Sequence, residues 1–94
     1  MNKVSAVVVT YNRIELLKEC LEALEKQNYP CDILVVDNAS TDGTEEYIHA
    51  IKNKYTNLYY KNTGANIGGA GGFNFGMCWA VEAGYEYVWV MDDD

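Results

Sequence analysis

Three consecutive carboxylates, Asp92, Asp93 and Asp94, follow a run of β-branched and aromatic residues near the end of the sequence. That run, residues 85–91, is typical of a buried strand, so the acids must emerge from the apolar core at an edge. Adjacent carboxylates repel one another, and a hard divalent cation such as Mg²⁺ or Mn²⁺ relieves this repulsion. The acids therefore predict either a cation site or a solvated acidic turn.

Polar residues also follow the three earlier segments that predict strands. Thr10 to Arg13 follow the first segment, Asp37 ends the second, and Asn66 follows the third. In an open parallel sheet, ligands bind outside the carboxyl ends of the strands. We therefore expect four loops, including the acidic one, to face a single crevice.

Alternating strands and helices position these loops. Short apolar runs predict strands, and apolar residues at helical spacing predict the segments between them. This alternation is the pattern of right-handed βαβ units, and it predicts an α/β fold with a Rossmann-like parallel sheet and flanking helices. The predicted strands are 4–9, 32–37, 58–60 and 85–91. The predicted helices are one of about four turns between Asn12 and Pro30, one that follows the turn 38–44 and ends before Lys52, and one from about Gly72 that stops at Gly84.

Two further features belong to the helices. Asn12 is predicted to cap the first helix, with Glu15 completing a capping box. The apolar stripe of that helix consists of Leu17, Cys20, Leu21 and Leu24. Cys78 also falls in an apolar helical pattern, and packing is its expected role.

Gly68, Gly69, Gly71 and Gly72 surround Ala70 where a loop is expected to enter a helix. Each glycine in helical backbone costs ~1 kcal/mol relative to alanine. The cluster therefore predicts a tight turn or a close approach of the backbone to another group, with a flexible turn as the alternative. A helix N-terminus here favours an anion such as phosphate. The sequence contains neither a Walker phosphate loop nor a dinucleotide-binding fingerprint.

Length and charge limit the class of protein. Ninety-four residues predict one domain, 1–94. A net charge of −7 argues against nucleic acid or an anionic membrane as a partner. We expect no membrane span and no signal peptide, and hence a cytoplasmic protein. The three cysteines predict neither a disulfide framework nor a zinc site.

Several aromatic residues have ordinary explanations. His49 is expected on a helix surface or in packing, and Tyr59 and Tyr60 are expected as strand residues. Tyr11 lies in a loop at a strand end. It either stacks on a base or packs over the first helix.

Four motifs together resemble the start of a family 2 glycosyltransferase with the GT-A fold. They are VVVTYNR at 7–13, VVDNASTDGT at 35–44, NIGGAGGF at 66–73 and WVMDDD at 89–94. The glycine run and the triple aspartate resemble the galactofuranosyltransferase branch in particular. The resemblance covers essentially the whole chain.

This resemblance implies roles for individual residues. Thr10, Tyr11 and Arg13 would line the uracil and diphosphate side, and Asp37 would accept a hydrogen bond from the base. Asn66 and Gly69 would contact the donor nucleotide. Asp92 and Asp93 would lie toward the ribose and diphosphate, and Asp92 and Asp94 would hold the metal, although a triple aspartate allows a shift of one residue. No catalytic base is assigned.

The implied reaction is an inverting, metal-dependent transfer from a UDP-galactofuranose-like donor to a saccharide or lipid-linked saccharide acceptor. The part that binds the acceptor in such enzymes is missing, so we expect a truncated chain that binds the donor without turnover. The complete enzyme could act at the cytoplasmic face of the membrane. The alternatives are a rhamnosyl or other NDP-sugar transferase, a sugar-nucleotide nucleotidyltransferase and a non-catalytic nucleotide-binding module.

Overall fold

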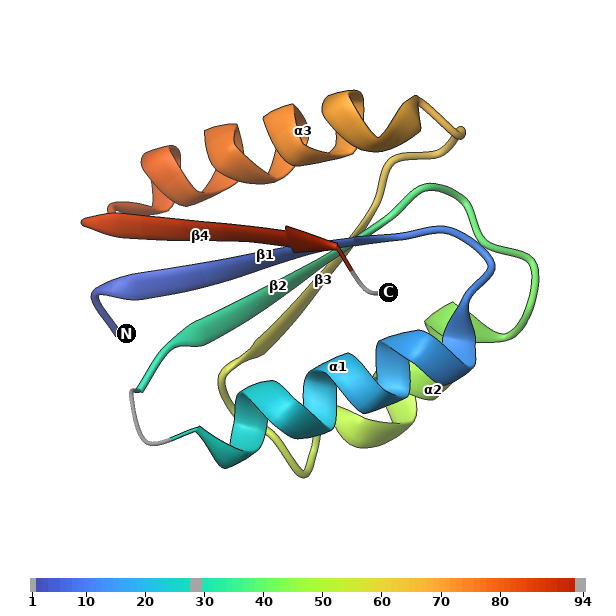
Figure 1. The fold of residues 1–94 in the computed structure, drawn as a ribbon, viewed down its shortest axis with the longest axis horizontal. Helices are drawn as coiled ribbons and strands as arrows, with labels where there is room; N and C mark the ends of the chain where they lie inside the picture. The colour runs from blue at the N-terminus through green and yellow to red at the C-terminus, as the bar shows by residue number, and fades with distance from the viewer. Residues whose placement is uncertain (1, 28–29, 93–94) are drawn as a thin grey trace.

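The computed structural model describes residues 2–27 and 30–92. Strands and helices alternate along the chain, as the sequence predicts. They are β1 Val4–Thr10, α1 Ile14–Lys26, β2 Asp32–Asp37, α2 Thr44–Ile51, β3 Leu58–Asn62, α3 Gly68–Ala83 and β4 Tyr87–Asp92. Figure 1 shows one sheet with α3 on one face and α1 and α2 on the other.

The four strands form one parallel sheet in the order β3-β2-β1-β4. The central strand β1 pairs with β2 through Thr10 opposite Asp37, and with β4 through Val9 opposite Asp92. Since all the strands run in one direction, their carboxyl ends lie along the same edge of the sheet. The prediction of an α/β fold with a Rossmann-like parallel sheet is confirmed.

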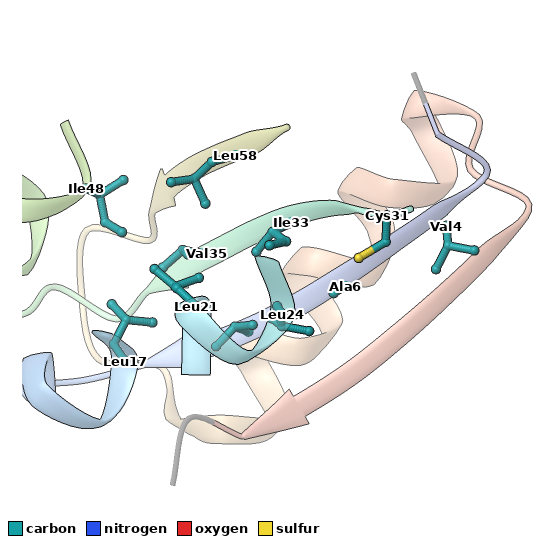
Figure 2. Close-up of a cluster of buried hydrophobic side chains, with 11 residues drawn as sticks. Val4, Ala6, Leu17, Leu21, Leu24, Cys31, Ile33, Val35, Ile48 and Leu58 are labelled. Carbon is teal, nitrogen blue, oxygen red and sulfur yellow. The ribbon is translucent and has the colours of Figure 1, made fainter. Parts of the chain in front are cut away.

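The larger core cluster lies between the sheet and the two helices α1 and α2 (Figure 2). The strands contribute every second residue to it, and α1 contributes the predicted leucine stripe, with Cys20 partly buried beside it. Its buried members are Val4, Ala6, Val8, Leu17, Leu21, Leu24, Cys31, Ile33, Val35, Ile48 and Leu58.

The smaller cluster lies under α3 and consists of Val7, Val9, Leu34 and Val36. Two glycines let this helix lie close to the strands. A Cβ added at Gly72 would lie 2.7 Å from Val9 Cγ1, and one added at Gly76 would overlap Val7 and lie 3.1 Å from Val36 Cγ2. The prediction that the glycine-rich segment approaches another group closely is thus confirmed at Gly72.

A buried polar network fixes the amino ends of the strands, opposite the edge described above. The side chain of Asp32 is buried and accepts hydrogen bonds from the Tyr85 hydroxyl at 2.5 Å and from Asn2 Nδ2 at 2.8 Å. Burial and the adjacent carboxylate raise the pKa of Tyr85 above its ordinary value. The phenol therefore remains a hydrogen-bond donor at neutral pH.

Several details differ from the sequence predictions. The third helix begins at Gly68 rather than near Gly72, because Gly68 makes the turn with a φ of +78° and the later glycines stay helical. The last strand begins at Tyr87, since Tyr85 enters the network at the amino ends. The expected packing role of Cys78 is wrong, because its side chain is exposed on the outer side of α3.

The proposed cap at Asn12 is also wrong. Asn12 has a left-handed backbone with a φ of +50°, and α1 begins two residues later at Ile14. The N–H of Ile14 donates instead to Asp42 Oδ2, in the loop after β2. A neighbouring loop therefore caps this helix, and a local capping box does not.

Within 2–27 and 30–92, no helix combines the length and the apolar character that crossing a membrane requires.

Candidate functional site

A pocket of about 250 Å³ lies at the carboxyl edge of the sheet. It is formed by the end of β1, the loop after β2 and the turn that leads into α3. Five residues predicted from the sequence as nucleotide-binding line it. The lining residues are Val9, Thr10, Tyr11, Arg13, Asn38, Asn66, Gly68 and Gly69.

Hydrogen bonds between the loops after β1 and β2 hold one wall of this pocket. The backbone N–H of Asn12 donates to Ser40 Oγ at 2.9 Å, and the N–H of Thr41 donates to Asn12 Oδ1 at 2.7 Å. The contact between Ile14 and Asp42, at 3.1 Å, adds a third connection. The left-handed backbone of Asn12 thus places its side chain between the loops, and this arrangement fixes the pocket residues on either side of it.

Asp42 is the charged member of this connection. Partial burial would raise the pKa of its carboxyl group, but hydrogen bonds from the Thr44 hydroxyl and the Ile14 N–H outweigh burial and lower it. The ionised form is therefore the one that the folded loop stabilises. Since the folded pKa is depressed, this contribution to stability is present above the unfolded pKa and is lost as the pH falls through the folded pKa.

Asp37 is not one of the lining residues of the pocket. Its side chain is completely buried. Oδ1 accepts a hydrogen bond from the N–H of Ser40 at 2.9 Å, and Oδ2 accepts one from the Tyr60 hydroxyl at 2.7 Å. Burial and the Asp37 carboxylate raise the pKa of Tyr60. Asp37 therefore supports the loop after β2, and its contact with a base stays a prediction.

Asn38 is the polar side chain among the three lining residues that the sequence reasoning did not name as nucleotide-binding; the other two are Val9 and Gly68. Its side chain is 2% exposed, but it reaches the pocket from the end of β2. The available signal was its position, because a polar residue that directly follows a parallel strand lies at the ligand-binding edge. Choosing between Asp37 and Asn38 requires the direction of each side chain, which the sequence pattern does not give.

The turn into α3 forms the opposite wall. The N–H of Gly68 donates to Asn66 Oδ1 at 3.0 Å, which stabilises the left-handed turn at Gly68. Among residues 2–27 and 30–92, no heavy atom lies within 4 Å of a Cβ added at Gly69, so this part of the chain leaves the backbone there open to a ligand. Tyr11 faces this turn from the β1 loop, where its side chain is 43% exposed.

The acidic residues after β4 are only partly within the described part of the chain. The backbone of Asp92 is paired with Val9, which lines the pocket, so the strand that carries the acids ends beside the pocket. Asp93 and Asp94 lie outside the described residues. Within 2–27 and 30–92, no group of three acidic, histidine or cysteine residues is placed to hold a metal. The metal site at Asp92 and Asp94 stays a prediction.

A larger cavity, of about 610 Å³, lies beside α3 and β3. Its lining includes Lys61, Phe75 and Trp79, and none of the described residues predicted as a site belongs to it. The smaller pocket is the candidate site because it lies at the edge where loops of a parallel sheet bind ligands.

Comparison with known proteins identifies the class of enzyme that combines this fold with a pocket at this edge. The model of glycosyl transferase family 2 matches residues 5–94. The chain belongs to this family. The resemblance inferred from the four sequence motifs is therefore confirmed.

Individual relatives extend beyond this chain. Galactofuranosyltransferase GlfT1 of Mycolicibacterium smegmatis is 39% identical over 92 residues, which cover 97% of this chain and 30% of the relative. The structure of mannosyltransferase PcManGT of Pyrobaculum calidifontis in complex with GDP-Man and Mn²⁺ matches with a TM-score of 0.85 at 30% identity, covering 98% of this chain and 27% of that one. The structure of Staphylococcus aureus TarS 1–349 in complex with UDP matches with a TM-score of 0.82 at 33% identity, and the match covers 99% of this chain and 28% of the TarS chain. The chain thus spans about 30% of the length of these relatives.

Proposed function

We propose that this chain binds the donor nucleotide in a glycosyltransferase that transfers a sugar from a UDP-sugar to a saccharide acceptor. The observation that carries the proposal is the meeting of Thr10, Tyr11, Arg13, Asn66 and Gly69 in one pocket. These residues come from two loops that are far apart in the sequence. A shared ligand site gives a common reason for their residue types at this edge.

The chemistry of the pocket suits a nucleoside diphosphate. Arg13 contributes a guanidinium group that can form paired hydrogen bonds to phosphate oxygens. The backbone at Gly69 lies in the first turn of a helix, where N–H groups and the helix dipole favour an anion. The exposed ring of Tyr11 offers a face on which a base can stack.

A divalent cation, Mn²⁺ or Mg²⁺, belongs to the proposal. Carboxylate oxygens suit both ions, and the register of β4 brings the chain at Asp92 next to the pocket wall at Val9. Asp92 and Asp94 would hold the ion, while Asp93 would lie toward the ribose and diphosphate. The ion would offset the negative charge that develops on the departing diphosphate.

A UDP-galactofuranose-like donor is the finer proposal, supported by the glycine run and by the similarity to GlfT1. A rhamnosyl donor is the nearest alternative. The similar structures bind different nucleotides, since PcManGT is in complex with GDP-Man and TarS with UDP. The base must therefore be identified by experiment. The residues that bind the acceptor and the catalytic base are expected in the part of the longer relatives that this chain does not span.

Calorimetric titration with UDP, UMP, CDP, GDP and dTDP, each with and without Mn²⁺, tests the proposal. We expect UDP to bind more tightly than the other nucleotides, and Mn²⁺ to strengthen its binding because an ion held by the acids would offset the charge of the diphosphate. UMP should gain little from the metal, since it has a single phosphate group. Tighter binding of dTDP than of UDP would favour the rhamnosyl alternative.

Substitutions of matched charge test the metal site. Asp94→Asn should abolish most of the strengthening by Mn²⁺. Glu86→Gln removes one negative charge at the opposite end of β4, where the side chain is exposed, and should leave UDP binding unchanged. Metal-independent UDP binding that no substitution at Asp92, Asp93 or Asp94 alters would contradict the proposed role of the acids.

A further inference from the structure

Asn38 makes hydrogen bonds to three separate segments around the pocket. Its backbone N–H donates to the carbonyl of Thr10 at 3.0 Å, at the end of β1. Its side-chain Nδ2 donates to the carbonyl of Gly68 at 3.1 Å, at the start of α3. Its Oδ1 lies 3.1 Å from the hydroxyl of Thr63, just after β3. One buried residue thus connects both walls of the pocket.

The contact with Gly68 holds the residue at which α3 begins. Gly68 adopts the left-handed turn, and its carbonyl is held by an amide that is itself rigidly placed at the end of β2. Gly72, one turn further along, lies so close that an added Cβ would be 3.4 Å from Asn38 Nδ2. The first turn of α3 is therefore packed directly against this side chain.

We propose that Asn38 is a positioning residue for the donor nucleotide, because it sets the distance between the β1 end and the first turn of α3. This inference rests on the proposed function, since it concerns the same pocket. Loss of the amide removes the side-chain donor that ties the Gly68 carbonyl to the end of β2, and it releases the turn that carries Gly69 from the sheet. The width of the pocket then changes although the sheet beneath it remains intact.

Thr63 allows this positioning to be separated from a direct contact with the ligand. Its single hydroxyl proton can be donated to Asn38 Oδ1 at 3.1 Å, to the Ala65 carbonyl at 2.6 Å or to the Asp37 carbonyl at 3.4 Å, but Thr63 is not a lining residue of the pocket. Thr63→Val keeps the shape of the side chain and removes only the hydroxyl. A residue outside the pocket can affect nucleotide binding here only through the network around Asn38 and the adjoining turn.

The test is a double-mutant cycle in the 94-residue chain with Asn38→Ala, Thr63→Val and both together. Titration with UDP and Mn²⁺ gives the dissociation constant, and hydrogen exchange gives the protection of amides 64–72. We expect Asn38→Ala to weaken UDP binding about tenfold, the effect of one lost buried hydrogen bond, and Thr63→Val by about threefold. The double variant should bind within about twofold of Asn38→Ala alone, because both changes disrupt one network.

The outcomes separate this inference from the proposed function. The positioning role would be overturned if the two substitutions had additive effects on UDP binding. It would also be overturned if only Asn38→Ala weakened binding while hydrogen exchange at residues 64–72 stayed normal. Either result would mean that Asn38 only contacts the ligand. Absence of UDP binding in the unmodified chain would contradict the proposed function instead. Faster exchange at 64–72 in both single variants would then still support the positioning role. Thr56→Val, the same change at an exposed site before β3, should have no effect on either measurement.

Discussion

Replacement of Gly76 by alanine should destabilise the chain even though alanine is the better helix former. The change gains ~1 kcal/mol from helix propensity. It also places a methyl group against Val7 and Val36, both completely buried, so neither can move aside cheaply. Overpacking of this kind costs ~1–3 kcal/mol, and the severe overlap with Val7 favours the upper end. We expect a net loss of ~1–2 kcal/mol in the free energy of unfolding.

Gly69→Ala in the same helix is the matched control. An added Cβ there meets no heavy atom of the described part of the chain within 4 Å, so only the propensity gain, up to ~1 kcal/mol, remains. Urea unfolding followed by tryptophan fluorescence should show the two variants moving in opposite directions, with a difference of ~2–3 kcal/mol between them. Equal stability of the two variants, or a stabilised Gly76→Ala, would refute the view that α3 lies on the sheet through glycine contacts.

Three further predictions concern the loops and the buried networks. Asp42→Ala should cost ~1 kcal/mol at pH 7, as the loss of a helix cap does. The difference in free energy of unfolding between the unmodified chain and this variant should disappear as the pH falls through the depressed pKa of Asp42. Urea unfolding at pH 7 and at pH 2 measures this difference. A difference that is the same at both pH values would exclude a cap by the ionised carboxylate. Tyr85→Phe should cost ~1–3 kcal/mol because it leaves the buried Asp32 with one partner fewer. The affinity of the Tyr85→Phe variant for UDP should stay unchanged, since the network around Asp32 lies at the end of the sheet opposite the pocket. A weaker affinity would contradict the view that the network and the pocket are independent. Arg13→Gln should weaken UDP binding about tenfold by calorimetry, the effect of one charge-assisted contact, whereas Lys26→Gln at the far end of α1 should not.

The architecture could be predicted from the sequence because its local signals agree with the fold. Continuous β-branched runs such as 4–9 and 32–37 predict strands buried on both faces, and these runs are the two central strands. The leucine spacing of α1 likewise predicts the face that is buried. The β-branched runs and the leucine spacing depend only on neighbours along the chain and on the need to bury apolar side chains. The parallel direction of the strands follows from the alternation of strands and helices.

The pocket was predictable in its location and less so in its details. Parallel strands place their following loops at one edge, so Thr10 and Asn66 could be assigned to the same pocket before any coordinates were available. The cap on α1 could not be predicted, because Asp42 comes from a separate loop and competes successfully with the local Asn12. The orientation of Asp37 toward Tyr60 was equally inaccessible, since it depends on a side chain from β3.

The pairing of the first strand with the last has a consequence for synthesis of the protein. β1 occupies the centre of the sheet, yet its β4 side is completed only when Tyr87–Asp92 have left the ribosome. Until then the nascent chain carries an open, strongly apolar strand edge, which is a site where chains can associate with one another. Almost the whole chain lies between the two strands that pair. The entropy cost of closing this long loop therefore slows the pairing of β4 with β1. A ribosome stalled before Tyr87 should therefore hold a chain that binds chaperones, and release of β4 should end that binding.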